Sequence, residues 1–104
     1  MPTTTPVIEP QTVIRTAPWW NVVLLNDDDH TYEYVIDMLG KVFGHSPEQA
    51  LRMALEVDTT GRVIVDTTSK ERAELKQEQV QAFGPDPRLP RSAGSMTAEI
   101  EPVE

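Results

Sequence analysis

The sequence predicts a small α+β domain in which helices cover one face of a three-stranded antiparallel sheet. Three observations support this fold class. Segments of strand type and segments of helix type follow one another in the order β-α-α-β-α-β. The 104 residues are enough for one domain with one core. Strands that are separated by helices favour a sandwich of one helical layer on one sheet.

The first 17 residues differ in composition from the rest of the chain. They contain Pro2, Pro6 and Pro10 and several threonines, but few apolar side chains that could pack on a core. Such a segment buries too little apolar surface to offset the entropy lost on ordering. We therefore expect a disordered N-terminal arm over residues 1–17 and a folded domain over residues 18–104.

The domain should begin with a strand and a helix. Residues 19–25 read WWNVVLL, and this aromatic and β-branched run predicts a strand that is buried on both faces near its end. A polar loop at 26–30 follows. Thr31 is a suitable N-cap for a helix that starts at Tyr32, and Gly44 marks its end. One apolar stripe at helical spacing predicts the inner face of this helix: Tyr34, Val35, Met38, Leu39, Val42 and Phe43.

A second helix is indicated by the start signal of Ser46, Pro47 and Gln49 and should run to about Val57. Its inner side should carry Ala50, Leu51, Ala54, Leu55 and Val57.

The second half of the domain should add two strands and a helix. A turn at 59–61 leads into an alternating strand at 62–67. Thr68 and Glu71 form a capping-box pattern that opens a helix through about Phe83. The last expected elements are a proline-rich loop over 84–94 and a short strand over 95–101, with Met96, Ala98 and Ile100 on one face.

Composition narrows the classes of function. The net charge is −8 and the pI is about 4.6, which disfavours nucleic acid and anionic membrane surfaces as partners and favours cationic ones. The chain has no cysteine, so it forms no disulfide framework and no thiolate site. No apolar run is long enough to cross a bilayer, and no secretory signal is visible. We expect a cytoplasmic monomer.

The densest polar cluster is the acidic loop, residues 26–30, which reads Asn-Asp-Asp-Asp-His. Adjacent carboxylates repel each other and favour a counter-charge. A metal ion, a shared proton or the ammonium or guanidinium group of a ligand could each supply it. The alternative is a solvated loop whose carboxylates complement the N-terminus of the following helix.

Metal binding and catalysis find little support in the residue spacing. An EF-hand register that starts at Asp27 would need Gly and Glu where the chain has Tyr32 and Met38. His30 and His45 belong to no zinc-binding pattern. No nucleophile elbow and no glycine-rich phosphate cradle is present. We therefore expect a non-enzymatic protein with no metal and no cofactor.

The stretch VVLLNDDDHTYEYVIDML at 22–39 resembles the ClpS adaptor family, in which a strand, an Asn-Asp-Asp triplet and a helix follow one another in this form. The resemblance covers about residues 18–101. It continues through VFGHSPEQALRMALEV, TTGRVIV, KERAELKQEQVQAFG and AGSMTAEIEP.

This resemblance implies an adaptor for N-degrons. Such a protein binds substrates whose first residue is Leu, Phe, Tyr or Trp, and delivers them to the N-domain of a Clp AAA+ unfoldase (ClpA or ClpC type) that works with the ClpP peptidase. The matching positions imply α-amino binding by Asn26, Asp27, Asp28 and Asp58. They imply a side-chain pocket of His30, Tyr32, Val35, Ala54, Val57 and Met96, and an unfoldase interface of Glu71 and Lys76.

Several positions depart from the family pattern or have a simpler interpretation. Asp58 stands where the family usually has His, and it could instead cap the turn at 59–61. Tyr32 stands at a gate position that is commonly aliphatic, and Ala54 at one that is often Met. Glu71 could serve only the capping box, and Lys76 could be a solvated helix residue.

Two other functions remain open from the sequence. One is a protein-docking module of the ribosomal-stalk C-terminal type, which uses a helical face and does not need the acidic loop. The other is a divergent ClpS paralogue that binds the unfoldase but no degron.

Overall fold

The structure is a computed structural model that describes residues 18–103. Within these residues the chain forms three strands and three helices around one core, and the predicted α+β fold class is confirmed. The arm predicted at 1–17 lies outside the described residues. In chain order the elements are β1 (Trp20–Leu25), α2 (Tyr32–Phe43), α3 (Pro47–Thr60), β2 (Arg62–Thr68), α4 (Lys70–Gln81) and β3 (Ala98–Pro102).

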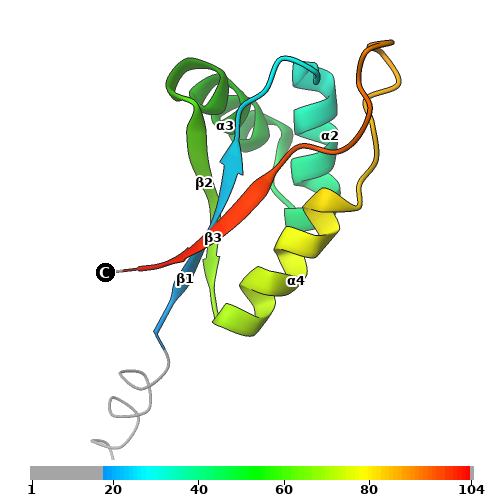
Figure 1. The fold of residues 1–104 in the computed structure, drawn as a ribbon. Helices are drawn as coiled ribbons and strands as arrows, with labels where there is room; N and C mark the ends of the chain where they lie inside the picture. Colours follow the sequence, from blue (N-terminus) through cyan, green and yellow to red (C-terminus); the bar gives the residue numbers. More distant parts are fainter. Residues whose placement is uncertain (1–17, 104) are drawn as a thin grey trace, which may run out of the picture.

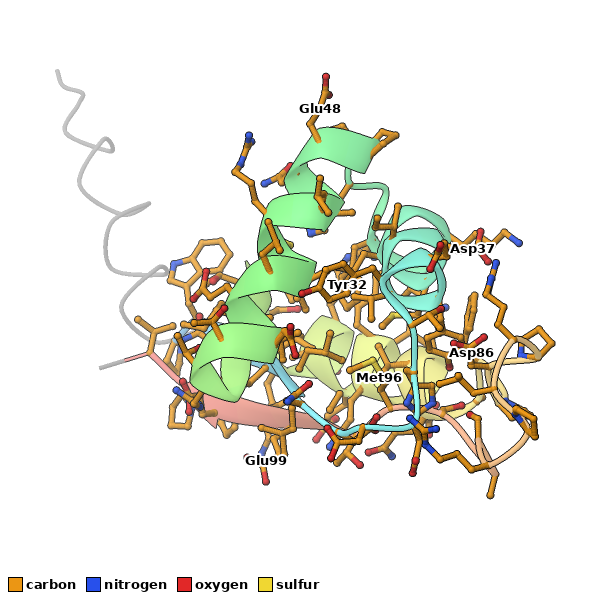
Figure 2. All side chains as sticks on the ribbon, turned by 90° about the horizontal axis from the view of Figure 1, so that it is seen from above. Tyr32, Asp37, Glu48, Asp86, Met96 and Glu99 are labelled. Carbon is orange, nitrogen blue, oxygen red and sulfur yellow. The ribbon has the colours of Figure 1, made fainter. Side chains whose placement is uncertain are left out.

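The three strands form an antiparallel sheet in the order β2-β1-β3, and the helices pack on one of its faces (Figure 1). Val22, Val23 and Leu24 of the central strand are completely buried, which confirms the prediction of a strand covered on both sides. Val22 and Leu24 belong to the core beneath the helices. Val23 lies opposite Ile64 and Glu99, and Glu99 projects from the side of the sheet away from the helices (Figure 2).

Helix α2 begins and ends where the sequence predicts. The hydroxyl oxygen of Thr31 accepts a hydrogen bond from the backbone N–H of Tyr34, which satisfies one of the free donors at the helix start. Gly44 has a φ of 75° and donates its N–H to the carbonyl of Gly40. This left-handed conformation favours glycine because it has no Cβ. The predicted inner stripe is confirmed for Tyr34, Val35, Met38, Leu39 and Val42, which are buried, whereas Phe43 at its end is only partly buried against the core.

Helix α3 is longer than predicted and buries a narrower face. It continues through Thr60, and the hydroxyls of Thr59 and Thr60 donate to the carbonyls four residues earlier. The predicted turn at 59–61 is therefore wrong except for Gly61, whose φ of 92° ends the helix. The prediction that Leu51 and Leu55 lie on the inner side of this helix is also wrong, because these side chains are 41% and 45% exposed. The inner side consists of Ala50, Ala54 and Val57.

The boundaries of the later elements also differ from the predictions. Ser69, rather than Thr68, is the N-cap of α4 and accepts from the N–H of Arg72, because Thr68 is still paired in β2. Helix α4 ends at Gln81, before Phe83. Strand β3 begins at Ala98, so Met96 precedes it in the sequence but is still buried against the core.

Two backbone hydrogen bonds hold the acidic loop at the end of the sheet. The N–H of Asn26 donates to the carbonyl of Gly61 at 3.0 Å, and the N–H of Leu25 donates to the carbonyl of Thr97 at 3.0 Å. The end of β1 is thereby joined to the end of α3 on one side and to the segment before β3 on the other. Because α2 starts directly after the loop and packs against α3, these parts converge at one place.

Candidate functional site

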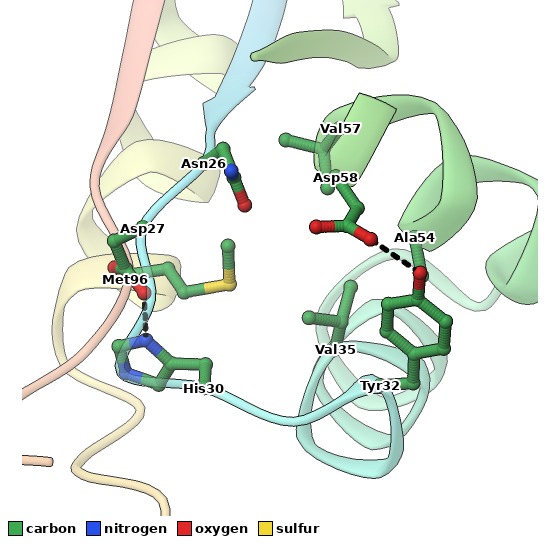
Figure 3. Close-up of a pocket in the computed structure, with 9 residues that line it drawn as sticks. All are labelled: Asn26, Asp27, His30, Tyr32, Val35, Ala54, Val57, Asp58 and Met96. Atoms are coloured by element: carbon green, nitrogen blue, oxygen red, sulfur yellow. Dashed lines mark hydrogen bonds and ion pairs between the residues drawn. The ribbon is translucent and has the colours of Figure 1, made fainter. Parts of the chain in front are cut away.

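A pocket lies where the acidic loop, the first turns of α2 and the last turns of α3 converge (Figure 3). Its empty volume is about 270 Å³, part of which is open to solvent. It has a polar side and an apolar side. The residues that line it are Asn26, Asp27, His30, Tyr32, Val35, Ala54, Val57, Asp58 and Met96. The structure thus brings together nine of the positions that the sequence singled out.

The carboxylate of Asp27 is oriented by its own loop. Its Oδ1 atom accepts from the backbone N–H of Asp29 at 2.9 Å and lies 2.6 Å from Nδ1 of His30. No hydrogen bond to the other oxygen comes from the described part of the chain. About a third of the Asp27 side chain is exposed, so this second oxygen can accept from a ligand.

His30 connects the acidic loop to the segment that precedes β3. Its Nε2 atom lies 2.7 Å from the carbonyl of Gly94, its side chain is only 3% exposed, and its ring packs on that of Tyr34 at 4.5 Å. His30 therefore holds Asp27 in place and connects the acidic loop to the segment before β3, which carries Met96.

Asn26 and Asp58 face each other across the pocket. Figure 3 shows the Asn26 amide and the Asp58 carboxylate pointing toward the same space from β1's end and from α3. The Oδ2 atom of Asp58 accepts a hydrogen bond from the Tyr32 hydroxyl at 2.5 Å. The pKa of Tyr32 is raised above its ordinary value. The largest cause is this hydrogen bond, followed by burial and by the negative charge of Asp58. Asp58 thus contacts Tyr32 and does not cap the turn after α3.

The apolar side of the pocket is part of the core. Val35, Ala54, Val57 and Met96 are each less than 5% exposed, and all four belong to the same hydrophobic cluster. Their packing would be required in any protein with this fold. In this protein they also form an apolar surface that excludes water directly beside the oxygen acceptors of Asn26, Asp27 and Asp58. The arrangement suits a ligand that carries a cation and an apolar group on neighbouring atoms.

Asp28 lies outside this group. Its side chain is exposed and does not line the pocket, whereas its backbone carbonyl accepts from the guanidinium of Arg91 at 2.5 Å. Arg91 also contacts the carboxylate of Asp29 at 3.2 Å. The middle of the acidic loop is therefore fastened to the proline-rich segment and lies outside the pocket.

The sequence did not single out Asp86, which holds the residue directly after the acidic loop, Thr31, in place. Its side chain is fully buried, and it accepts from the N–H and the hydroxyl of Thr31 at 2.7 and 2.8 Å and from the N–H of Arg88 at 3.0 Å. Burial opposes the charged form, but these hydrogen bonds lower the pKa to about 2. An Asp whose carboxylate accepts from the N–H two residues later forms an Asx-turn, and the Pro-Asp-Pro-Arg pattern was its only visible signal.

Comparison with known proteins agrees with this arrangement. The family described as "ATP-dependent Clp protease adaptor protein ClpS" matches residues 15–88, which is most of the chain. This chain belongs to the ClpS family. Three relatives are ClpS adapters of the ATP-dependent Clp protease. The protein of Methylococcus capsulatus is 38% identical over 71% of this chain and 70% of its own, and that of Nautilia profundicola is 38% identical over 76% and 80%. The protein of Aromatoleum aromaticum is 40% identical over 70% and 72%.

A solved structure shares the fold. Agrobacterium tumefaciens ClpS2, which was determined bound to L-phenylalaninamide, superimposes with a TM-score of 0.72 and 25% identity. The match covers 84% of this chain and 99% of that one. As a ClpS protein, this chain belongs to an adaptor family of the Clp protease and not to a family of catalysts. In residues 18–103 no three His, Asp or Glu side chains are placed to hold a metal ion, and no helix is long and apolar enough to cross a membrane.

The two positions expected at the unfoldase interface lie on α4, apart from the pocket. Glu71 is exposed in the first turn of the helix. Lys76 is half-buried, and its ammonium donates to the carbonyl of Val42 at 2.7 Å and lies 5.8 Å from the ring centre of Phe43. Lys76 is therefore more than a solvated helix residue, because it satisfies a free carbonyl at the end of α2.

Proposed function

We propose that this ClpS protein binds polypeptides by a free N-terminus whose first residue is Leu, Phe, Tyr or Trp, and hands them to a Clp AAA+ unfoldase. The observation that carries the proposal is the junction of two surfaces in one pocket. Oxygen acceptors of Asn26, Asp27 and Asp58 stand beside a buried apolar wall. An N-terminal residue with a large apolar side chain presents an ammonium and an apolar group from the same carbon atom.

The polar side matches the needs of an α-ammonium. This group has three N–H donors, and each is satisfied by an oxygen at roughly 2.8–3.0 Å. The second oxygen of Asp27, the amide oxygen of Asn26 and the Asp58 carboxylate can supply such acceptors. Because two of them carry negative charge, the site favours a cation over a neutral amine or an acetylated terminus. Asp28 contributes charge to the surroundings of the site from outside the pocket.

The apolar side matches the first side chain. Val35, Val57 and Met96 offer only carbon and sulfur atoms, so a polar first residue would lose its hydrogen bonds to water without replacement. Ala54 adds little bulk, so it takes up less of the pocket than a larger apolar side chain would. The structure of ClpS2 with L-phenylalaninamide supports this reading, because that ligand is a phenylalanine with a free amino group and a blocked carboxyl end. Recognition by this site requires no chemical step.

A peptide titration tests degron binding directly. Peptides that begin with Phe, Leu, Tyr, Trp or Ser are labelled at their C-termini and measured by fluorescence anisotropy, with free and with acetylated N-termini. We expect acetylation to weaken binding of the Phe peptide by about 100-fold or more, because the ligand loses its charge and its donors. The Ser peptide should bind weakly in both forms.

The same titration separates the remaining alternatives. Equal affinity for free and acetylated peptides would contradict the proposed recognition of the α-ammonium. An absence of binding to all peptides, with unfoldase binding retained, would identify a paralogue that does not recognise degrons. The ribosomal-stalk alternative is removed by membership in the ClpS family.

We also propose that α4 carries the contact with the unfoldase N-domain. Glu71 is exposed there, and Lys76 stabilises the junction of α4 with α2. Glu71→Lys should weaken binding to an isolated ClpA or ClpC N-domain by about tenfold or more, since it reverses an interface charge. Calorimetry measures this binding, and the affinity for a Phe peptide should not change.

Glu48→Lys provides a matched control for this substitution. Glu48 is the second residue of α3 behind the cap Ser46, as Glu71 is the second residue of α4 behind the cap Ser69. Both variants therefore lose the same favourable interaction with a helix N-terminus. If the two variants lose unfoldase affinity to the same extent, the contact does not lie at Glu71.

A further inference from the structure

The hydrogen bond between Tyr32 and Asp58 spans the mouth of the pocket from one helix to another. Tyr32 is the first residue of α2, and Asp58 lies in the last turn of α3, 26 residues later. Neither side chain belongs to the core, because Tyr32 is 39% exposed and Asp58 is exposed as well. The bond is thus not a by-product of core packing.

Because of this bond, Asp58 contacts Tyr32 on one side of the pocket and faces the polar acceptors on the other. One carboxylate oxygen accepts from the Tyr32 hydroxyl at 2.5 Å, while the other points into the space in front of Asn26 (Figure 3). Among residues 18–103 no Lys, Arg or His forms an ion pair with Asp58. Its charge is therefore available to a ligand, and its orientation is set by the tyrosine.

The same bond determines where the Tyr32 ring stands. Ala54 fills little of the space next to this ring, so the width of the pocket at that point depends on the tyrosine. A tyrosine in the first helical turn has few neighbours to restrict its rotamer. With its hydroxyl held by α3, the ring becomes a fixed wall of the pocket, because its side-chain torsions can no longer change freely.

We propose that the Tyr32–Asp58 hydrogen bond is a brace that couples selection of the first side chain to recognition of the α-ammonium. This inference rests on the proposed function of the pocket. The brace holds the Tyr32 ring at a set distance from Met96 and Val57, and it holds the second oxygen of Asp58 toward the ammonium. A first side chain that displaces the ring also turns Asp58 away, so a poor fit in the apolar part weakens the polar contact.

A double-mutant cycle tests the brace. The variants are Tyr32→Phe, which keeps the ring and removes the hydroxyl, Asp58→Asn, and the combination of both. Affinities for Leu, Phe and Trp peptides with free N-termini are measured by fluorescence anisotropy. We expect Asp58→Asn to weaken binding about tenfold in the wild-type background but less than about threefold in the Tyr32→Phe background. Tyr32→Phe should also reduce the ratio between the tightest and the weakest peptide at least about threefold.

Two further measurements complete the test. Asp37→Asn removes the same charge from the solvent face of α2, where Asp37 pairs with Lys41, and should leave the affinities and their ratios unchanged. The second measurement follows the ionisation of the two tyrosines by absorbance in the absence of ligand. In Asp58→Asn one of the two tyrosines should ionise at a lower pH than in the wild-type protein. In Tyr32→Phe only the ionisation of Tyr34 should remain.

Additive effects of the two substitutions, with an unchanged ratio among the peptides, would overturn the brace. This outcome differs from failure of the proposed function. If wild-type protein prefers free over acetylated peptides and the cycle is additive, the pocket recognises degrons without the brace. If wild-type protein shows no such preference, the proposed function itself is wrong.

Discussion

Asp27→Asn should weaken the binding of a peptide with a free N-terminal Phe by about 30- to 150-fold, which corresponds to about 2–3 kcal/mol for a charged hydrogen bond. The Oδ1 atom of Asp27 is already occupied by the N–H of Asp29 and by His30. An Asn amide that keeps these two contacts through its oxygen must present its NH₂ group to the ligand. A donor then faces the ammonium in place of a charged acceptor. Fluorescence anisotropy with the labelled Phe peptide measures the loss.

Asp28→Asn is the matched control for this prediction. It removes the same charge from the neighbouring residue, but the Asp28 side chain is exposed and lies outside the pocket. Its effect should be less than about threefold, because an exposed charge at that distance is screened by salt. If both variants lost affinity equally, the site would act through the summed field of the acidic loop and not through the acceptor of Asp27.

Asp86→Ala should have the largest effect on stability, lowering the free energy of unfolding by about 2–3 kcal/mol and the melting temperature by about 10–20 °C. Four groups that now donate to the carboxylate would lose their partner: the N–H and hydroxyl of Thr31, and the N–H and guanidinium of Arg88. Thr31 caps α2, so its displacement would also loosen the first turn that carries Tyr32. Urea unfolding monitored by circular dichroism measures the change.

The acid dependence of stability provides a second measurement on Asp86. Its pKa is about 2 in the folded protein, against an ordinary value of 3.8. A carboxyl whose pKa is lowered by folding stabilises the protein above its ordinary pKa, and this contribution disappears as the pH falls through the folded value. Wild-type protein should therefore lose stability between about pH 4 and pH 2, and Asp86→Asn should lose less over that range.

Asp37→Asn again serves as a control, since Asp37 is half-exposed and pairs with Lys41 at 3.4 Å. Its acid profile should follow that of the wild-type protein. An Asp86→Asn profile that also follows the wild-type protein would show that the buried carboxylate is not the group responsible for acid sensitivity.

Local patterns alone were sufficient to predict the frame of this protein. The order of the elements follows from apolar periodicity, and α2 begins at Thr31 and ends at Gly44 as predicted, because caps act through hydrogen bonds within a few residues. The acidic loop was recognisable for the same reason. Several carboxylates in succession are costly without a counter-charge, and this holds in any fold.

Local patterns failed where several alternatives satisfied the same rule. Thr68 and Ser69 are both good caps, and the choice of Ser69 depends on how far β2 continues its pairing with β1. Leu51 and Leu55 are apolar and on a helix, yet they are exposed, because the smaller Ala50 and Ala54 allow α3 to pack closely on its neighbours. Which apolar face is buried depends on the shape of the opposite surface.

By itself, then, the sequence determined the element order, the ends of α2 and the presence of an acceptor-rich loop beside an apolar stripe. Only the tertiary structure decided which acceptors face the pocket and what orients them. Asp58 binds Tyr32 and Asp86 is buried against Thr31, whereas Asp28 lies outside the pocket and its backbone carbonyl accepts from Arg91. The physical reason is that each of these oxygen atoms could accept from any nearby donor, and the donors in Tyr32, Thr31 and Arg91 lie 26, 55 and 63 residues away in the chain.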